Sequence, residues 1–149
     1  MRVALGCDHA GFEMKQQILD CVKGLGHEVV DVGAHNSAPS DYPDFTEALA
    51  LAIVNHQAER GILICGSGVG SSVAANKIPG IRAGLCHDYY SAHQGVEHDN
   101  INVLVLGSRV IGFELARDLV SVFLRAEFSG EERHLRRLAK VQLLETRYR

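Results

Sequence analysis

The sequence predicts an α/β protein, a three-layer Rossmann-like sandwich with a five-stranded parallel sheet and an extra C-terminal helix. Two observations carry this prediction. Short β-branched apolar runs alternate with amphipathic segments along most of the 149 residues, and the connections between them are short. This alternation is typical of parallel sheets with helices on both faces, because each parallel pair needs a crossover. A single domain over residues 1–149 is expected.

The predicted elements follow from apolar period and flanking residues. Gly24 and Gly26 mark the end of the first helix, Gly33 closes the second strand, and Pro43 suits a first helical turn. The apolar run Gly61–Cys65 is typical of a strand covered on both faces. In order, we expect a strand at Arg2–Cys7, a helix at Phe12–Leu25, a strand at His27–Val32, a helix from Pro43 to about His56, a strand at Gly61–Cys65, helical residues after Gly70, a strand near Ile81–Cys86, a helix near Tyr89–Val96, a strand at Asn102–Leu106, a helix near Gly112–Ala126 and a final helix from about Glu131.

Composition argues against several classes of function. The apolar fraction of 46% and the charged fraction of 22% are typical of globular proteins. The formal charge of −3 does not favour a nucleic-acid partner, and the local basic excess after Glu131 is too short and mixed for a polymer. No apolar run is long enough for a membrane span, and no secretion signal opens the sequence. The four cysteines are therefore expected to be free thiols in a reducing, cytoplasmic compartment.

Ligands of such sheets bind beyond the carboxyl ends of the strands. The most informative segment there is Cys65-Gly66-Ser67-Gly68-Val69-Gly70-Ser71-Ser72, a glycine-rich loop that leads into a helix and favours an anion. It is neither a Walker A loop nor a GxGxxG fingerprint, although Asp88 keeps a dinucleotide site open. Cys65 is either a base or nucleophile, its pKa lowered at the helix N-terminus, or the small last residue of a strand. Ser67 binds a substrate oxygen or only forms the turn.

Several short motifs, in matching order and spacing, resemble the type B ribose-5-phosphate isomerases over almost the whole chain. The motifs are GCDHAG at Gly6–Gly11, DYPDF at Asp41–Phe45, ICGSGVG at Ile64–Gly70, AANKIPGIRA at Ala74–Ala83, NVLVLGSRVIG at Asn102–Gly112 and RHLRR at Arg133–Arg137. The resemblance implies a sugar-phosphate isomerase that needs no cofactor or metal. It also implies a homodimer or homotetramer with active sites shared between subunits.

The resemblance assigns roles to individual residues. Cys65 would move the proton between C2 and C1, Ser67 replaces the threonine of many relatives, and His98 would accept the anomeric hydroxyl proton while Asp8 handles the ring oxygen. The backbone from Gly66 to Ser71 would stabilise the enediolate. The remaining substrate contacts would come from His9, Tyr42, Gly66, Gly68, Val69, Gly70, Ser71, Asp99, Asn100, Arg109, Arg133 and Arg137.

For some of these residues a purely structural role remains open. His9, Arg133 and Arg137 match the phosphate clamp of the family, and the two arginines share a helix face, which otherwise would only be solvated. Arg109 contacts substrate or bridges carboxylates. Asn76 is expected, with Lys77, to shape a helix end.

The chain departs from the family at His98-Asp99-Asn100, where relatives read His-Asn-Asp. Either Asp99 takes the place of the sugar-binding asparagine, or Asn100 does so after a backbone shift. His87, Asp88, His93 and His98 suggest a metal site, but their spacing matches no compact ligand motif. Some branches of the superfamily act on tetrulose, allose or galactose phosphates.

The leading hypothesis is interconversion of ribose 5-phosphate and ribulose 5-phosphate. The same chemistry on a tetrulose 4-phosphate, an erythrose 4-phosphate or a hexose 6-phosphate is the alternative. A non-catalytic nucleotide-binding module would bind NAD or ATP and ignore sugar phosphates. A Cys–His hydrolase would form an acyl intermediate on Cys65.

Overall fold

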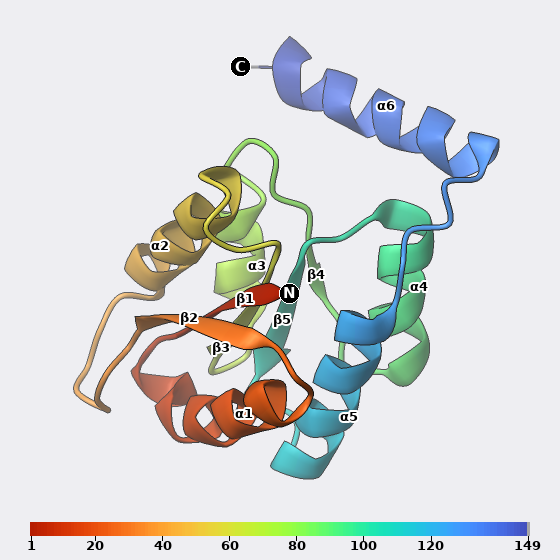
Figure 1. The fold of residues 1–149 in the computed structure, drawn as a ribbon. Helices are drawn as coiled ribbons and strands as arrows, with labels where there is room; N and C mark the ends of the chain where they lie inside the picture. Colours follow the sequence, from red (N-terminus) through yellow and green to blue (C-terminus); the bar gives the residue numbers. More distant parts are fainter. Residues whose placement is uncertain (149) are drawn as a thin grey trace.

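The computed structural model describes residues 1–148 and confirms the α/β class (Figure 1). Each predicted element is present, with end points that differ by a few residues. In order, the described elements are β1 (Arg2–Cys7), the short 3-10 helix η1 (His9–Gly11), α1 (Phe12–Gly24), β2 (Glu28–Gly33), α2 (Tyr42–Val54), β3 (Arg60–Cys65), α3 (Val69–Ala75), β4 (Ala83–Leu85), α4 (Tyr89–Asp99), β5 (Val103–Gly107), α5 (Phe113–Arg125) and α6 (Glu132–Arg147).

The described strands form one parallel sheet in the order β2-β1-β3-β5-β4. Alternate residues of each strand point to opposite faces, which separates the core into two parts. One part packs under α1, α4 and α5, and the other under α2 and α3. The three predicted layers are therefore helices, sheet and helices.

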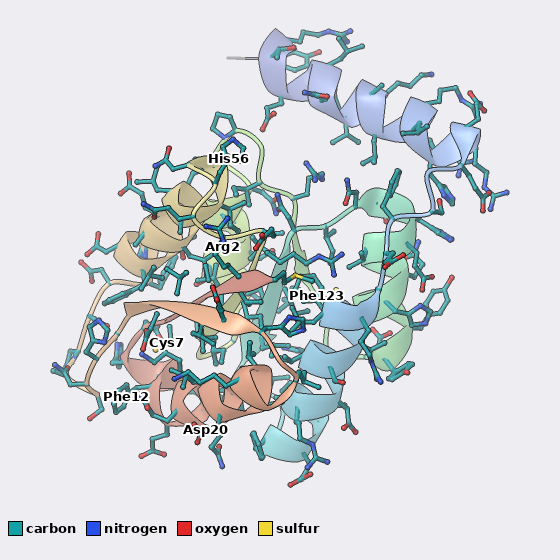
Figure 2. The ribbon with its side chains drawn as sticks, viewed as in Figure 1. Arg2, Cys7, Phe12, Asp20, His56 and Phe123 are labelled. Atoms are coloured by element: carbon teal, nitrogen blue, oxygen red, sulfur yellow. The ribbon has the colours of Figure 1, made fainter. Side chains whose placement is uncertain are left out.

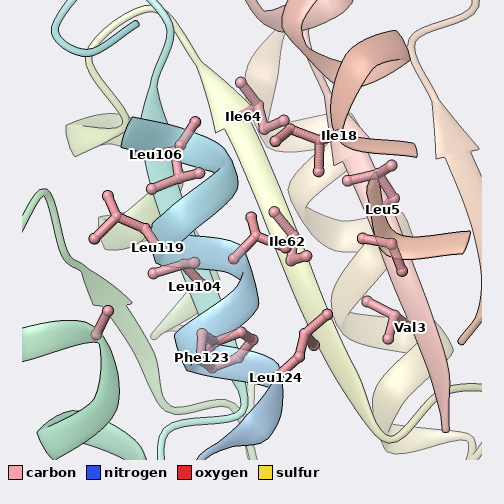
Figure 3. Packing of buried hydrophobic residues seen from close by; sticks show 14 of the residues in the cluster. Val3, Leu5, Ile18, Ile62, Ile64, Leu104, Leu106, Leu119, Phe123 and Leu124 are labelled. Carbon is pink, nitrogen blue, oxygen red and sulfur yellow. The ribbon is translucent and has the colours of Figure 1, made fainter. Parts of the chain in front are cut away.

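The first part of the core contains the larger side chains. In Figure 3, Ile62 and Leu104 lie beside Leu119 and Phe123 of α5, while Leu5 on the next strand lies beside Ile18 of α1, and all six are fully buried. Burial of one such side chain stabilises a fold by roughly 1.5–3 kcal/mol. This packing fixes the relative positions of the strands, and with them the residues at their carboxyl ends.

One helix end and one additional short helix differ from the prediction in a way that concerns the site. The predicted helix near Tyr89–Val96 continues to Asp99, and Asn100 ends it with a left-handed backbone (φ 48°). Asparagine tolerates this conformation better than most residues. His98 and Asp99 therefore belong to the last turn of α4. The short helix η1, which the sequence pattern did not indicate, begins directly after β1.

Helix α6 stands away from the rest of the molecule, at the end of an extended segment that follows α5 (Figure 1). It lies over the amino ends of the strands, and two clefts separate it from them. The first, of about 630 Å³, lies between α6 and residues 80–83 and 99–101. The second is lined by Arg2 and His56 together with Gln142 and Glu145 of α6. Figure 2 shows Arg2 on the side of α6 and Cys7, at the other end of β1, on the far side.

Candidate active site

Cys65 is the last residue of β3, and its side chain is buried. Its Sγ lies 2.6 Å from Oγ of Ser71 in the first turns of α3. Burial raises the pKa of the Cys65 thiol to about 11; the bond to Ser71 opposes this rise only in part, and the nearby Asp8 carboxylate adds to it. The expectation of a lowered pKa is therefore wrong for the single chain. The loss of hydration raises the pKa of the thiol by more than the local hydrogen bonds lower it.

Asp8 and His9 follow β1 at the same edge of the sheet. Oδ1 of Asp8 accepts hydrogen bonds from the backbone N–H groups of Ala10 (3.0 Å) and Gly11 (3.1 Å), so this carboxylate caps η1. The backbone N–H of Ser40 donates to Nδ1 of His9 (3.2 Å). An amide can only donate, so Nδ1 must carry a lone pair and a neutral His9 carries its proton on Nε2. His9 thus has a donor to offer to an anion.

The glycine-rich loop is held in a tight path between β3 and α3. Gly68 has a φ of +82°, and a Cβ there would lie 2.8 Å from Cδ1 of Leu85. A side chain at this position would be both strained and crowded. Oγ of Ser67 accepts a hydrogen bond from the N–H of Val69 (3.2 Å), as its turn-forming role requires. Tyr42, at the start of α2, lies against the backbone of Gly70.

Arg109 belongs to the turn after β5, and its side chain lies against Gly66. Its backbone N–H donates to the carbonyl of Gly66 (2.9 Å). Asp8, His9, Tyr42, Arg109 and the loop from Cys65 to Ser71 therefore gather around the carboxyl ends of β1, β3 and β5. We call these residues the strand-end group.

His98 lies elsewhere, in the last turn of α4, between two residues that the sequence pattern did not single out. Its Nδ1 is 3.0 Å from the amide nitrogen of Gln94, one turn earlier. Its ring stacks on that of His134 in α6, with centroids 4.1 Å apart and planes inclined by 25°. Gln94 was detectable as the residue four before His98 on a helix, but the stacking depends on the path of the chain between α5 and α6.

His134 is almost fully buried and fixed by two hydrogen bonds. Nε of Arg133 donates to its Nε2 (3.3 Å), so the other ring nitrogen, Nδ1, bears the proton and donates to Oγ of Ser129 (2.6 Å). Burial, followed by the nearby charges of His98 and Arg133, lowers the pKa of His134. This shift favours the neutral form of His134 beside His98.

Asp99 and Asn100 complete the end of α4. Asp99 is exposed, whereas Asn100 ends the helix and its carbonyl accepts a hydrogen bond from Nε of Arg82 (2.7 Å). Arg133 and Arg137 lie on one side of α6, and Arg133 pairs with Glu131 (3.3 Å). We call His98, Asp99, Asn100, Arg133 and Arg137 the helix-end group.

The strand-end group lies at the carboxyl ends of the strands, and the helix-end group lies at their amino ends. Helix α4 starts after the carboxyl end of β4, and its 11 residues run back to the amino end of β5. At 1.5 Å per residue, the helix places His98 about 13 Å from Tyr89, its first residue. The cleft beside Asp99 and Asn100 is lined by α6 and contains no residue of the strand-end group. The resemblance assigns all these residues to one site that is shared between subunits, and a single chain does not bring them together.

Three other expectations can be compared with the structure. Asp88 caps α4 by accepting a hydrogen bond from the N–H of Ser91 (2.7 Å), which gives this residue a structural role. Asn76 ends α3 and bonds to the backbone of Ala83, as predicted for a residue that shapes a helix end. The cysteines are free thiols, as expected.

Two further findings concern residues 1–148 as a whole. No cluster of three or more His, Cys, Asp or Glu side chains suited to a metal ion is found among them. No helix in this part of the chain is long and apolar enough to cross a membrane.

Comparison with known proteins identifies the family. Residues 3–141 match the model of the Ribose/Galactose Isomerase family. The chain belongs to this family. It is 44% identical to ribose-5-phosphate isomerase B of Escherichia coli strain K12 over 98% of this chain and 97% of that protein. Over 87% of this chain and 86% of the other protein, it is 41% identical to the D-erythrulose-4-phosphate isomerase of Pectobacterium atrosepticum.

The fold has a close counterpart among solved structures. The Clostridium thermocellum ribose-5-phosphate isomerase B superposes with a TM-score of 0.97 at 45% identity, and the match covers 100% of both chains. This likeness confirms the family expected from the sequence motifs and the sandwich described above. The chain is therefore an enzyme of the isomerase class.

Proposed function

We propose that this protein interconverts ribose 5-phosphate and ribulose 5-phosphate by ring opening followed by proton transfer through an enediolate. The observation that carries the proposal is the strand-end group. A buried thiol lies at the carboxyl end of β3, between the Asp8 carboxylate and a glycine-rich loop. The similarity to proteins named ribose-5-phosphate isomerase B supports the choice of substrate.

In the proton-transfer step, Cys65 removes the proton from C2 of the open-chain aldose and returns it to C1. Backbone N–H groups between Gly66 and Ser71 stabilise the negative charge that develops on the enediolate oxygens, and Ser67 adds its hydroxyl. The reaction requires a thiolate, yet the pKa of Cys65 stands at about 11 in the single chain. At pH 7 ionisation would then cost about 5 kcal/mol. Positive charge brought to the thiol would reduce that cost.

The helix-end group contains such charges, and together with Asp8 and His9 of the strand-end group it supplies the residues proposed for ring opening and phosphate binding. His98 takes the anomeric proton while Asp8 assists at the ring oxygen. Arg133, Arg137 and His9 bind the phosphate, with Tyr42 and Arg109 lining the site. Asp99 is exposed in the last turn of α4, whereas Asn100 is partly buried, so Asp99 is the residue proposed to accept hydrogen bonds from sugar hydroxyls. Of the two alternatives that the exchanged residues left open, this geometry favours Asp99.

We further propose that two copies assemble so that the strand-end group of one faces the helix-end group of the other. A two-fold homodimer would complete two such sites at once. Exposed apolar side chains are present near both groups: Val69, Val73 and Val110 at the strand ends, and Leu135, Val141 and Leu143 on α6, each more than half exposed. A tetramer would be two such dimers.

Mixed dimers test this assembly. Cys65→Ala and His98→Ala disable different groups, so each variant alone should be inactive. If they are unfolded together and refolded as a mixture, half of the dimers should be mixed, and about a quarter of the wild-type activity should return. Sedimentation velocity provides the oligomeric state. An inactive mixture of dimers would rule out shared sites.

The reaction itself is tested by proton NMR of the protein with ribose 5-phosphate in deuterated buffer. We expect conversion to ribulose 5-phosphate with deuterium at C1 of the ketose or C2 of the aldose. Erythrulose 4-phosphate and a hexose 6-phosphate, run in parallel, should react more slowly. No conversion of ribose 5-phosphate, or faster conversion of another sugar, would contradict the proposed substrate.

We also infer a reducing, cytoplasmic location and a place in pentose phosphate metabolism. Cys7, Cys65 and Cys86 are free and buried, which suits a compartment where thiols stay reduced. The pathway follows from the proposed reaction. Fractionation of cells carrying a tagged chain tests the location, and recovery of the protein outside the cytoplasm would contradict it.

A further inference from the structure

The turn Gly107-Ser108-Arg109 packs against the glycine-rich loop that begins at Cys65. The N–H of Ser108 donates to the carbonyl of Cys65 (2.7 Å), and its side chain donates to the carbonyl of Ala10 (2.8 Å). A Cβ on Gly107 would lie only 2.5 Å from the carbonyl oxygen of Ser67, so the two backbones are in direct contact. Any displacement of this turn therefore moves the loop that begins at Cys65.

The sheet itself does not hold the outer side of this turn. Strand β4 has three residues, and its last pair with β5 is Leu85 with Val105. Strand β5 continues for two more residues, to Gly107. The N–H of Gly107 donates to Nε2 of His87 instead, at 2.9 Å. The His87 side chain thus replaces the missing rung between the two strands.

This bond fixes the state of the imidazole. The amide of Gly107 can only donate, so Nε2 must present a lone pair and the proton of a neutral ring lies on Nδ1. Burial alone lowers the pKa of His87 from its ordinary value of 6.5, which favours the neutral form. The titratable or charged groups on the surrounding segments are Cys86 and Asp88 beside it in the chain, Cys65 on β3 and Arg109 on the turn.

We infer that His87 is a positioning residue for isomerisation: through Gly107 it holds the turn on which the Cys65 loop rests. The inference rests on the proposed function, because the proposed function assigns the proton transfer to Cys65 in this loop. Protonation of His87 at Nε2 would place its N–H against the N–H of Gly107. The hydrogen bond that holds the turn would then be lost. This residue contributes no group to the sugar; its effect passes through the position of Cys65.

Two substitutions separate positioning from simple loss of a side chain. His87→Leu fills a similar volume but cannot accept the bond, and we expect kcat for ribose 5-phosphate to fall by about tenfold to a hundredfold, with KM nearly unchanged. His87→Gln can place its carbonyl oxygen near Gly107 and should recover most of kcat. His93→Leu, on α4 and bonded to Glu97, is the matched control and should leave kcat unchanged. Wild-type kcat in His87→Leu, or equal losses in the Leu and Gln variants, would overturn the inference.

A measurement independent of turnover tests the bond. In ¹H–¹⁵N spectra, the Gly107 amide should titrate with His87 below pH 6.5, keep a pH-independent shift in His87→Gln, and move in His87→Leu even when the melting temperature is unchanged. In the wild type, kcat should decrease at low pH as His87 is protonated, and this ionisation should be absent from the pH profile of His87→Gln. If the chemical shift of the Gly107 amide did not respond to the protonation or substitution of His87, the inference would be overturned whatever the activity. An absence of wild-type turnover with an intact titration would contradict the proposed function alone.

Discussion

The strand-end and helix-end groups differ in what holds them. Most of the strand-end group follows strands that are paired on both sides and buried except at the first residues of β1 and β3, and backbone hydrogen bonds connect its loops to one another. The helix-end group depends on the last turn of α4 and on α6, where side-chain contacts such as the stacking of His98 on His134 predominate. The thiol that is proposed to act on C2 and C1 of the sugar thus lies on the more rigid support. His98, Arg133 and Arg137, which are proposed for ring opening and phosphate binding, lie on the less rigid support, where the proposed second copy would meet them.

The largest effect that this comparison predicts is for the rigid group. Cys65→Ala removes the proposed base, and kcat should fall by at least about 10²- to 10⁴-fold, because a positioned base contributes this much. The melting temperature and the affinity for inorganic phosphate should change little. Cys21→Ala, at a half-buried thiol of α1, serves as the control. Deuterium exchange by NMR is the assay, and retained turnover would exclude Cys65 as the base.

A substitution at His98 should separate ring opening from proton transfer. His98→Asn should lower kcat for ribose 5-phosphate by about a hundredfold. Erythrose 4-phosphate cannot close a furanose ring because its O4 carries the phosphate, so any turnover of this sugar should be much less affected. The ratio of the two rates in wild type and variant is the measurement. Equal losses for both sugars would mean that His98 acts after the ring has opened.

A smaller effect is expected at the phosphate clamp. Arg137→Ala removes one charge-assisted hydrogen bond, so KM for ribose 5-phosphate and the inhibition constant of inorganic phosphate should rise about tenfold. The control is Arg136→Ala, because Arg136 already pairs with Glu132 at 2.8 Å. Titration calorimetry with phosphate measures the change directly. Unaltered phosphate affinity would remove Arg137 from the clamp.

The smallest effect concerns the contact that connects α6 with α4. His134→Ala removes the ring that stacks on His98, and kcat should fall by about twofold to tenfold. His134→Phe keeps an aromatic surface without the bonds to Ser129 and Arg133, and it should recover part of the loss. Sedimentation velocity checks that both variants keep the oligomeric state of the wild type. A loss as large as that of His98→Asn would mean that His134 itself contacts the substrate.

Local patterns were sufficient for the fold and for the strand-end group. The apolar runs at Arg2–Cys7 and Gly61–Cys65 are strands in the structure, and the residues that follow them meet at one edge because parallel strands share a direction. Motif resemblance also singled out His98, Arg133 and Arg137, whose roles stay predictions. It did not find Ser40, Gln94 or His134, whose partners lie on other elements or one helical turn away.

The sequence by itself determined the order of elements, the sandwich and the family, because apolar period and short motifs are local properties of the chain. Only the tertiary structure decided three further points. It placed the two groups at opposite ends of the strands, because α4 runs antiparallel to β4 and continues to Asp99. It raised the pKa of Cys65, because burial depends on the whole core. It gave His87 a partner in Gly107, because β4 ends two residues before β5 does.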